Sequence, residues 1–320
     1  MIAVLAGGVG AARFLKGLIE VTDPRYVTAI VNTGDDTELH GLSISPDIDT
    51  VIYTLSGSID PQRGWGLRNE TWAAMEALAK FDAVRPVGSQ AAPRWFNLGD
   101  SDLATHFYRT ARVREGALLS QITDEIRRAF GLDITILPMS NDRVRTVIHL
   151  ADSSVSFQEY FVKLQHSVAV TSVDFEGASS ACFIDPKILT DADLIVIAPS
   201  NPIVSIGPIR ALSGVDDILA TRRDHVVAVS PIVAGAALKG PADHMLTELG
   251  HEATVVGIAR LYAPICGTLI IDIQDEHLVS AVEREGVRCI ATDTIMSGVG
   301  VAASLARTII NTQQPLGEPR

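Results

Sequence analysis

The first 21 residues, MIAVLAGGVGAARFLKGLIEV, decide the fold class. Residues 1–6 are a short apolar run of β-forming side chains, and the glycine turn 7–10 follows at once. Residues 11–21 then carry apolar side chains at helical spacing, and residues 26–31 (YVTAIV) form the next strand-like run. A strand, a glycine turn, a helix and a second strand are the opening of a doubly wound α/β fold.

The rest of the chain continues this alternation. Further buried-strand patterns lie at residues 134–137, 194–198, 226–229, 268–271 and 288–291. Helical patterns lie at residues 50–56, 68–80, 102–110, 116–130, 215–222, 242–249, 276–285 and 297–310. We therefore expect a mostly parallel, Rossmann-like sheet with helices on both faces.

One region departs from this pattern. Short alternating runs at 144–150, 153–157, 168–175 and 178–183 predict strands, with a helix near 158–165. The sequence thus predicts an α/β nucleotide-binding core of residues 1–140 and 186–320. A small antiparallel-rich insert of residues 141–185 interrupts it.

Composition excludes several classes of protein. A net charge of −12 argues against a broad grip on nucleic acid, although backbone N–H groups or a carboxylate-held metal still bind an anion locally. Cys182, Cys266 and Cys289 are far apart and lack CxxC spacing, so we expect buried thiols rather than a disulfide or zinc site. No apolar run approaches the roughly 20 residues that span a bilayer, so we expect no membrane partner and a cytoplasmic location.

The glycine turn is the first candidate site. Gly8, Gly10 and Arg13 stand where a helix N-terminus offers free N–H groups to a phosphate. Arg13 replaces the third glycine of a dinucleotide fingerprint, and no GK[ST] follows, so this is not a P-loop. A tight turn without a ligand is the structural alternative.

Four carboxylates form the second candidate site. Asp35 and Asp36 follow the predicted second strand, and Asp47 and Asp49 precede a predicted helix. A cap or a turn explains one such side chain but not four on two adjacent edge loops. Hard oxygen ligands suit Mg²⁺ that bridges substrate phosphates, or they contact a substrate hydroxyl.

Loops later in the chain supply further candidates. Trp95, Phe96 and Asn97 stand in a polar loop that suits a flat heterocyclic substrate, or one that its aromatic side chains pin to the core. His106 follows in a helical pattern that also suits a core histidine. Small and polar residues after two late strands include Asn201, Ser205, Gly207 and Lys239. These late loops line a nucleotide cleft, or they are ordinary strand-to-helix connections.

Seven blocks in this order resemble one family along nearly the whole chain. They are GGVGAAR (7–13), NTGDD (32–36), SPDIDTVIYTL (45–55), WFNLGDSDLATH (95–106), ILPMSND (136–142), APSNPIVSIGPI (198–209) and SPIVAGAALKGPADHM (230–245). The sequence resembles the CofD family, the 2-phospho-L-lactate transferases of coenzyme F420 biosynthesis. It is most similar to the actinobacterial branch, which transfers phosphoenolpyruvate.

The resemblance implies a reaction. Family members move a phospho-three-carbon-acid unit from a guanosine diphosphate-activated donor to the terminal ribityl hydroxyl of the deazaflavin Fo. They release GMP and give F420-0 or its dehydro form. Mg²⁺ is the family's metal, and its members are homodimers.

The resemblance also implies roles for the candidate residues. Gly8, Gly10 and Arg13 are expected to hold the diphosphate. Asp49 and one of Asp35 or Asp36 are expected to hold Mg²⁺ or orient the hydroxyl, with Asp49 and Asp36 as the catalytic and metal pair. The remaining residues contact substrate: Trp95, Phe96 and Asn97 on the deazaflavin side, and Asn201, Ser205, Gly207 and Lys239 on the guanosine side.

Two other functions share parts of the pattern. An NAD(P)-dependent oxidoreductase also uses a glycine turn, but the third glycine is missing and Asn32-Thr33 stands where an acidic ribose contact is usual. A non-catalytic nucleotide or deazaflavin sensor does not need clustered carboxylates. Both are weaker interpretations than a transferase.

Overall fold

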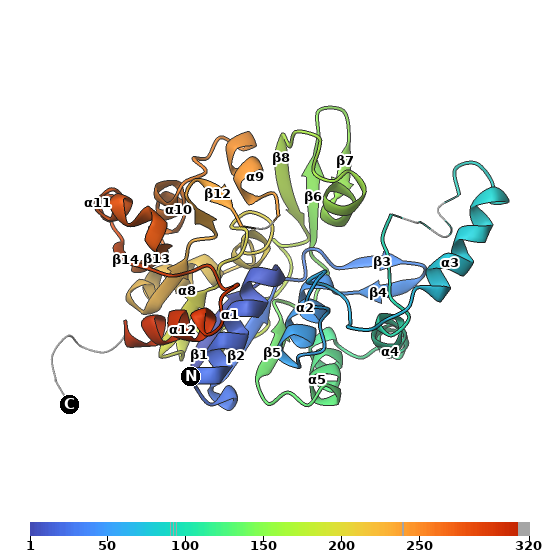
Figure 1. Ribbon diagram of the computed structural model, residues 1–320, viewed down its shortest axis with the longest axis horizontal. Helices are drawn as coiled ribbons and strands as arrows, with labels where there is room; N and C mark the ends of the chain where they lie inside the picture. The colour runs from blue at the N-terminus through green and yellow to red at the C-terminus, as the bar shows by residue number, and fades with distance from the viewer. Residues whose placement is uncertain (90, 92, 94, 239, 313–320) are drawn as a thin grey trace.

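A seven-stranded, fully parallel sheet forms the centre of the molecule, with strand order β14-β13-β10-β9-β1-β2-β5 (Figure 1). The computed structural model describes residues 1–89, 91, 93, 95–238 and 240–312. The strands are β1 (Ile2–Ala6), β2 (Val27–Val31), β5 (Thr135–Pro138), β9 (Leu194–Ile197), β10 (Val226–Val229), β13 (Thr268–Asp272) and β14 (Arg288–Thr292). This sheet confirms the predicted Rossmann-like class.

Helices cover both faces of the sheet and give it two separate apolar cores. One core packs against α1 (Gly8–Val21), α2 (Pro46–Leu55), α5 (Leu119–Ala129) and α12 (Val301–Asn311). The other core packs against α6 (Lys187–Thr190), α7 (Gly207–Arg210), α8 (Val215–Thr221), α9 (Ala242–Glu248), α10 (Val255–Tyr262) and α11 (Val279–Glu283). Alternate residues of each strand face opposite cores, which explains why the strands are apolar throughout.

The order of the strands creates a topological switch point beside β1. The chain runs outward from β1 through β2 to β5, returns to β9 on the other side of β1, and then runs outward again. Ile2 therefore pairs with Val27 on one side and with Leu194 on the other. Open α/β sheets bind ligands at this point, outside the carboxyl ends of the strands.

Smaller elements stand above those carboxyl ends in the view of Figure 1. Within residues 141–185, β6 (Arg145–His149), β7 (Ser154–Ser156) and β8 (Ser172–Glu176) form an antiparallel sheet of order β7-β6-β8. Two unpredicted hairpins join β3 (Thr37–Leu39) to β4 (Leu42–Ile44), and β11 (Ile232–Val233) to β12 (Ala236–Ala237). The helix α3 (Ala73–Ala79) projects on one side, and α4 (Asp102–Arg114) packs near β4.

Several local predictions were wrong. The strand predicted at 178–183 is a turn followed by irregular chain. A helix does form near the predicted 158–165, but as the π-helix Glu159–Lys163. The helix predicted at 68–80 begins only at Ala73, and α10 was not predicted. The helix predicted at 276–285 is divided between the 3₁₀ helix Ile273–Leu278 and α11. The other 3₁₀ helices are Pro24–Tyr26, Lys80–Ala83 and Arg223–His225.

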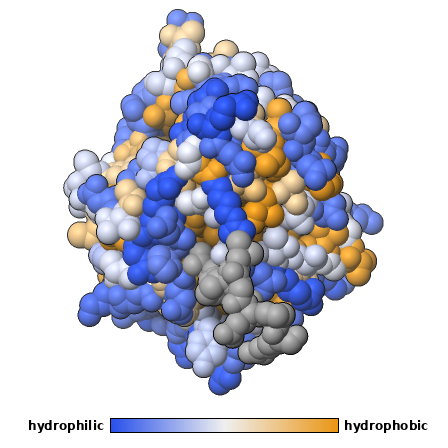
Figure 2. All heavy atoms as spheres, turned by 90° about the vertical axis from the view of Figure 1, so that its left-hand side faces the viewer, coloured by the Kyte–Doolittle hydropathy of each residue, from blue (hydrophilic) through white to orange (hydrophobic). Residues whose placement is uncertain are grey.

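One of the three thiols differs from expectation. Cys266 and Cys289 are buried as expected, whereas Cys182 is exposed. Among the described helices, none has both the length and the apolar character needed to cross a membrane. The face on the β14 side mixes hydrophilic side chains with small hydrophobic patches (Figure 2).

Candidate active site

A cleft of about 890 Å³ opens at the switch point. Residues that follow four central strands line it: Gly7 after β1, Asp35 after β2, Pro199 after β9 and Ser230 after β10. The cleft extends to the insert and to the loop that carries Trp95. A space of this size and position suits two medium-sized substrates at once.

The glycine turn begins α1 at the floor of this cleft. Gly8 has a left-handed backbone with φ +71°, and its N–H donates to Asp47 Oδ1 at 2.9 Å. A Cβ at Gly10 would lie 2.1 Å from the carbonyl oxygen of Pro199, so this glycine lets α1 approach the β9 loop. Gly8, Gly10 and Arg13 all line the cleft. In the first turn of a helix the backbone N–H groups have no partner within the helix. The N–H groups of the two residues after Gly8 are therefore free for a ligand.

Asn32 joins the two acidic loops beneath the turn. Its Nδ2 donates to Asp35 Oδ2 at 3.2 Å and to Asp47 Oδ2 at 3.0 Å, and its Oδ1 accepts from the N–H of Gly34 at 2.8 Å. One amide group thus holds two carboxylates side by side at the first turn of α1. The sequence analysis did not single out Asn32 for this role.

Burial makes these two carboxylates unusually basic. It raises the pKa of Asp47 to about 6. Burial, and then the charge of Asp47, raise the pKa of Asp35 well above its ordinary value. Oδ1 of Asp35 is buried without a hydrogen-bond partner among the described residues, although the nearby Thr146 hydroxyl acts to lower the pKa of Asp35, and both carboxylates line the cleft. Two adjacent carboxylates with an unpaired oxygen are a donor set that a hard divalent cation would neutralise.

The predicted pair of Asp36 and Asp49 is arranged differently, although Oδ1 of Asp36 is also buried without a hydrogen-bond partner among the described residues and burial raises the pKa of Asp36 as well. Ser45 Oγ donates to Asp36 Oδ2 at 2.7 Å, and Asp36 does not line the cleft. Both oxygens of Asp49 accept from Arg109, although Asp49 does line the cleft. Across the described ranges, no group of three or more His, Cys, Asp or Glu side chains converges on a common point. Any metal here therefore needs ligands from substrate or water as well.

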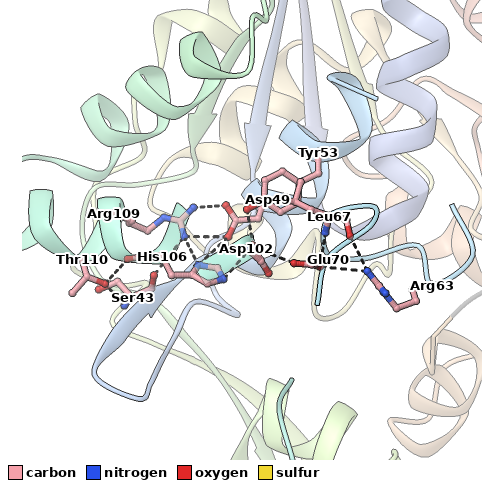
Figure 3. Close-up of polar contacts among 10 residues, drawn as sticks. All are labelled: Ser43, Asp49, Tyr53, Arg63, Leu67, Glu70, Asp102, His106, Arg109 and Thr110. Atoms are coloured by element: carbon pink, nitrogen blue, oxygen red, sulfur yellow. Dashed lines mark hydrogen bonds and ion pairs between the residues drawn. The ribbon is translucent and has the colours of Figure 1, made fainter. Parts of the chain in front are cut away.

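Arg109 anchors a buried polar network next to the cleft (Figure 3). Its side chain is 1% exposed and binds Asp49 end-on, with Nη1 at 3.1 Å from Oδ2 and Nη2 on Oδ1. Nη1 also lies 3.2 Å from Nδ1 of His106. Since a guanidinium only donates, this contact assigns the proton of a neutral His106 to Nε2, which faces Asp102 at 3.3 Å.

The network continues from Asp102 toward the segment that precedes the projecting helix α3. Tyr53 Oη donates to Asp102 Oδ1 at 2.6 Å, and the N–H of Asp102 donates to Glu70 at 3.1 Å. Glu70 in turn accepts from Arg63 at 3.3 Å. Burial alone would raise the pKa of Asp102, but the contacts from His106 and Tyr53 lower it below its ordinary value. Asp102 is therefore ionised at neutral pH and orients its neighbours.

Aromatic side chains line the cleft from two directions. Trp95 and Phe96 meet edge to face with ring centroids 5.8 Å apart, and with Asn97 they line one end. Phe157, Phe161 and His166 of the insert line another part. Trp95 and Phe96 also pack on the apolar cluster around Leu98, so these side chains both line the cleft and anchor the loop to the core.

The late loops agree only in part with the sequence analysis. Asn201 and Ser205 line the cleft, and Ser200 Oγ donates to the carbonyl of Gly7 at 2.8 Å. Gly207 does not line it: a Cβ there would lie 2.7 Å from the ring of Phe175, so this glycine serves packing against β8. Lys239 lies outside the described residues. The predicted substrate contact of Gly207 stays a prediction, since the structure places this residue outside the lining of the cleft.

The comparisons with known proteins show the family of this chain. A family model described as 2-phospho-L-lactate transferase CofD matches residues 2–309. The chain belongs to the CofD family. This membership confirms the resemblance and makes the chain a transferase, rather than an oxidoreductase or a non-catalytic sensor.

Curated relatives and solved structures match over nearly full length. A phosphoenolpyruvate transferase from Kitasatospora aureofaciens is 40% identical over 97% of this chain and 96% of its own. One from Mycobacterium tuberculosis H37Rv is 38% identical, covering 96% of each chain. A crystal structure of a UPF0052 family protein from Bacillus halodurans has a TM-score of 0.58 at 14% identity, over 97% of this chain and 98% of that one. That likeness supports the fold.

Proposed function

We propose that this chain transfers phosphoenolpyruvate from a guanosine diphosphate-linked donor to the ribityl hydroxyl of the deazaflavin Fo, giving dehydro coenzyme F420-0 and GMP. The observation that carries the proposal is the cleft at the switch point, which joins a phosphate-binding helix start to buried carboxylates and aromatic walls. The two curated relatives described above bear the name phosphoenolpyruvate transferase and span nearly the whole chain. A 2-phospho-L-lactyl donor is the closest alternative substrate.

The chemistry is a substitution at phosphorus. The ribityl oxygen forms a bond to the phosphorus that carries the three-carbon acid, and the bond from that phosphorus to the bridging oxygen breaks. GMP leaves with the bridging oxygen, and the hydroxyl proton passes to a carboxylate or to water. Such a reaction needs alignment and neutralised charge more than covalent help.

The residues of the cleft suit these needs. The N-terminus of α1 and Arg13 face the diphosphate, where free N–H groups and the helix dipole favour negative charge. Asp49, fixed by Arg109, accepts a hydrogen bond from the ribityl hydroxyl and orients it. Trp95 and Phe96 pack against the deazaflavin ring, while Asn201 and Ser205 face the guanosine side.

The metal position in the proposal moves from Asp36 and Asp49 to Asp35 and Asp47. These two line the cleft together, whereas Asp36 does not; burial raises the pKa of both, and Asp35 Oδ1 has no hydrogen-bond partner among the described residues. Mg²⁺ bound there would offset the charge of the diphosphate. We also propose a cytoplasmic homodimer; sedimentation equilibrium at twice the chain mass would support the dimer, and a monomer mass would contradict it.

A transfer assay with Fo, the enolpyruvyl donor and Mg²⁺ tests the proposal. Wild-type protein is expected to release GMP only when Fo is present. Asp49→Asn should fold, by circular dichroism, yet lose at least tenfold in kcat because the hydroxyl is no longer held by a carboxylate. Asp152→Asn is the matched control, since Asp152 is exposed and outside the cleft. Full activity of Asp49→Asn would remove its proposed role.

A further inference from the structure

Three aromatic rings of the insert form a continuous row beside the cleft. The rings of Phe157 and Phe161 are nearly parallel at 8°, with centroids 5.6 Å apart. His166 continues the row at 19° and 5.8 Å from Phe161. All three side chains line the cleft. Parallel, offset rings are the arrangement that extends readily by one more flat ring.

The row is buried at one end and open at the other. Phe157 is 9% exposed and belongs to an apolar cluster with Tyr160 and Met245. Phe161 is 37% exposed, and His166 is also exposed. A partly exposed phenylalanine that faces a cleft gains little from folding, since its apolar surface stays in water. Contact with a ligand ring would bury it.

The backbone that carries the row is irregular. Phe161 stands in the five-residue π-helix Glu159–Lys163. Gln165 and His166 follow with left-handed φ values of +51° and +42°, which cost free energy for residues other than glycine. Single-turn π-helices and left-handed residues of this kind cluster at functional sites. In this conformation His166 stacks on Phe161.

Contacts place the row beside Asn201, which the proposed function assigns to the guanosine. Asn201 Nδ2 lies 3.8 Å from Sδ of Met245, and Met245 packs in the same cluster as Phe157. Two carboxamides next to the rings, Gln158 and Gln165, also line the cleft and supply donors and acceptors to the edge of a base. Trp95 and Phe96 belong to a different apolar cluster, around Leu98.

We infer that Phe161 and His166, backed by Phe157, stack against the nucleobase of the guanosine diphosphate-linked donor. The inference rests on the proposed function for the identity of the base, and it assigns to the insert a binding role that the glycine turn cannot fill. Stacking of a base on an aromatic ring contributes about 1–3 kcal/mol, which is roughly 5- to 100-fold in affinity.

Calorimetric titration with GDP tests the inference without turnover. Phe161→Leu keeps apolar volume but removes the ring, and should weaken GDP binding roughly 5- to 100-fold. His166→Asn keeps a side chain that tolerates the left-handed backbone and should weaken GDP binding less strongly. Phe161→Tyr should bind GDP like wild type. Phe107→Leu is the matched control, since Phe107 is 57% exposed and lies outside the cleft.

Fluorescence titration with Fo separates the possible failures. The inference expects Fo affinity to stay within twofold of wild type in Phe161→Leu. Loss of Fo affinity with unchanged GDP affinity would assign the row to the deazaflavin and overturn the inference. Unchanged affinity for both ligands would overturn it as well, while leaving the transferase proposal intact. Absence of GDP binding by the wild type would instead contradict the proposed donor itself.

Discussion

At the scale of single residues, the site depends on buried carboxylates with different partners. Asp49 is neutralised by Arg109, whereas Asp35 and Asp47 face each other across the amide of Asn32. Uncompensated charge at a binding site lowers the stability of the empty protein. The difference between the two sets therefore predicts opposite responses to substitution.

Asp35→Asn should stabilise the protein without metal and weaken Mg²⁺ binding. Removing the charge of Asp35 removes the free-energy cost of burying it and its repulsion from Asp47. We therefore expect a gain of about 1–2 kcal/mol in the free energy of unfolding. Millimolar Mg²⁺ should raise the melting temperature of the wild type but not of the variant, because only the wild type keeps both carboxylates. An equal Mg²⁺-dependent rise in both proteins would contradict the assignment.

Stability should also depend on pH through the same pair. The folded pKa of Asp47 is about 6 against 3.8 for the ordinary side chain, so the folded state binds more protons between these values. The contribution of Asp47 to stability is therefore largest below pH 4 and is lost as the pH rises through 6. In metal-free urea titrations, wild type should lose more stability from pH 5 to pH 7 than Asp35→Asn does. Equal losses would show that the two carboxylates are not coupled.

Arg109 should behave in the opposite way to Asp35. Arg109→Gln leaves the carboxylate of Asp49 buried without its partner, which costs about 3–5 kcal/mol. The double variant Asp49→Asn/Arg109→Gln should lose less than the sum of the two single losses, because neither charge then remains alone. Urea unfolding of the four proteins measures this coupling. Additive losses would mean that the ion pair contributes no coupling to stability.

At the scale of elements, two glycines of the first turn have separable tasks. Gly8 needs a left-handed backbone, whereas Gly10 makes room for the carbonyl of Pro199. Gly8→Ala should cost about 1–2 kcal/mol, and Gly57→Ala should cost the same, since Gly57 has φ +70° with open space around it. Gly10→Ala must push α1 away from the β9 loop and should cost at least as much.

Nucleotide binding distinguishes these three variants. We expect GDP affinity to fall at least tenfold in Gly8→Ala and Gly10→Ala, because both alter the first turn of α1. Gly57→Ala should bind GDP like wild type, as it lies outside the cleft. Calorimetry on the folded variants measures both effects. If Gly8→Ala bound GDP normally, the turn would be a structural feature and not a phosphate site.

The regular elements were largely predictable, and the exceptions have physical causes. Strands buried on both faces appear as continuous apolar runs, so the central sheet follows from the sequence. The helix α10 was missed because VVGIARLY is rich in β-branched residues; its Thr254 cap and its burial against the sheet override that preference. The projecting helix α3 buries no residue, which explains why its start was poorly defined by periodicity.

The candidate site was predictable as a set of loops but not as a network. Parallel strands bring their carboxyl ends together, so Asp35, Asp49 and Asn201 were placed on one cleft. Their partners come from elements whose packing no local pattern reveals. Asp102, His106 and Arg109 do share helical spacing on α4, and this signal was available in the sequence. Gly207 packs against Phe175 outside the lining of the cleft, because small residues serve packing as well as binding.

At the scale of the whole molecule, the sheet and the insert contribute different parts of one reaction site. The switch point holds the glycine turn and the carboxylates, and the insert adds the aromatic row above them. The loop between the projecting helix α3 and α4 supplies Trp95 and Phe96 from another direction. A cleft assembled in this way suits two ring-bearing substrates joined at a phosphate, as the proposed transfer requires.

The most direct test of this account is mass spectrometry of the products made from Fo with the enolpyruvyl donor, and separately with the lactyl donor, in the presence of Mg²⁺. We predict one GMP for each Fo joined to phosphoenolpyruvate, with slower reaction of the lactyl donor. Release of GMP without an Fo adduct, or no reaction with either donor, would contradict the proposed transfer.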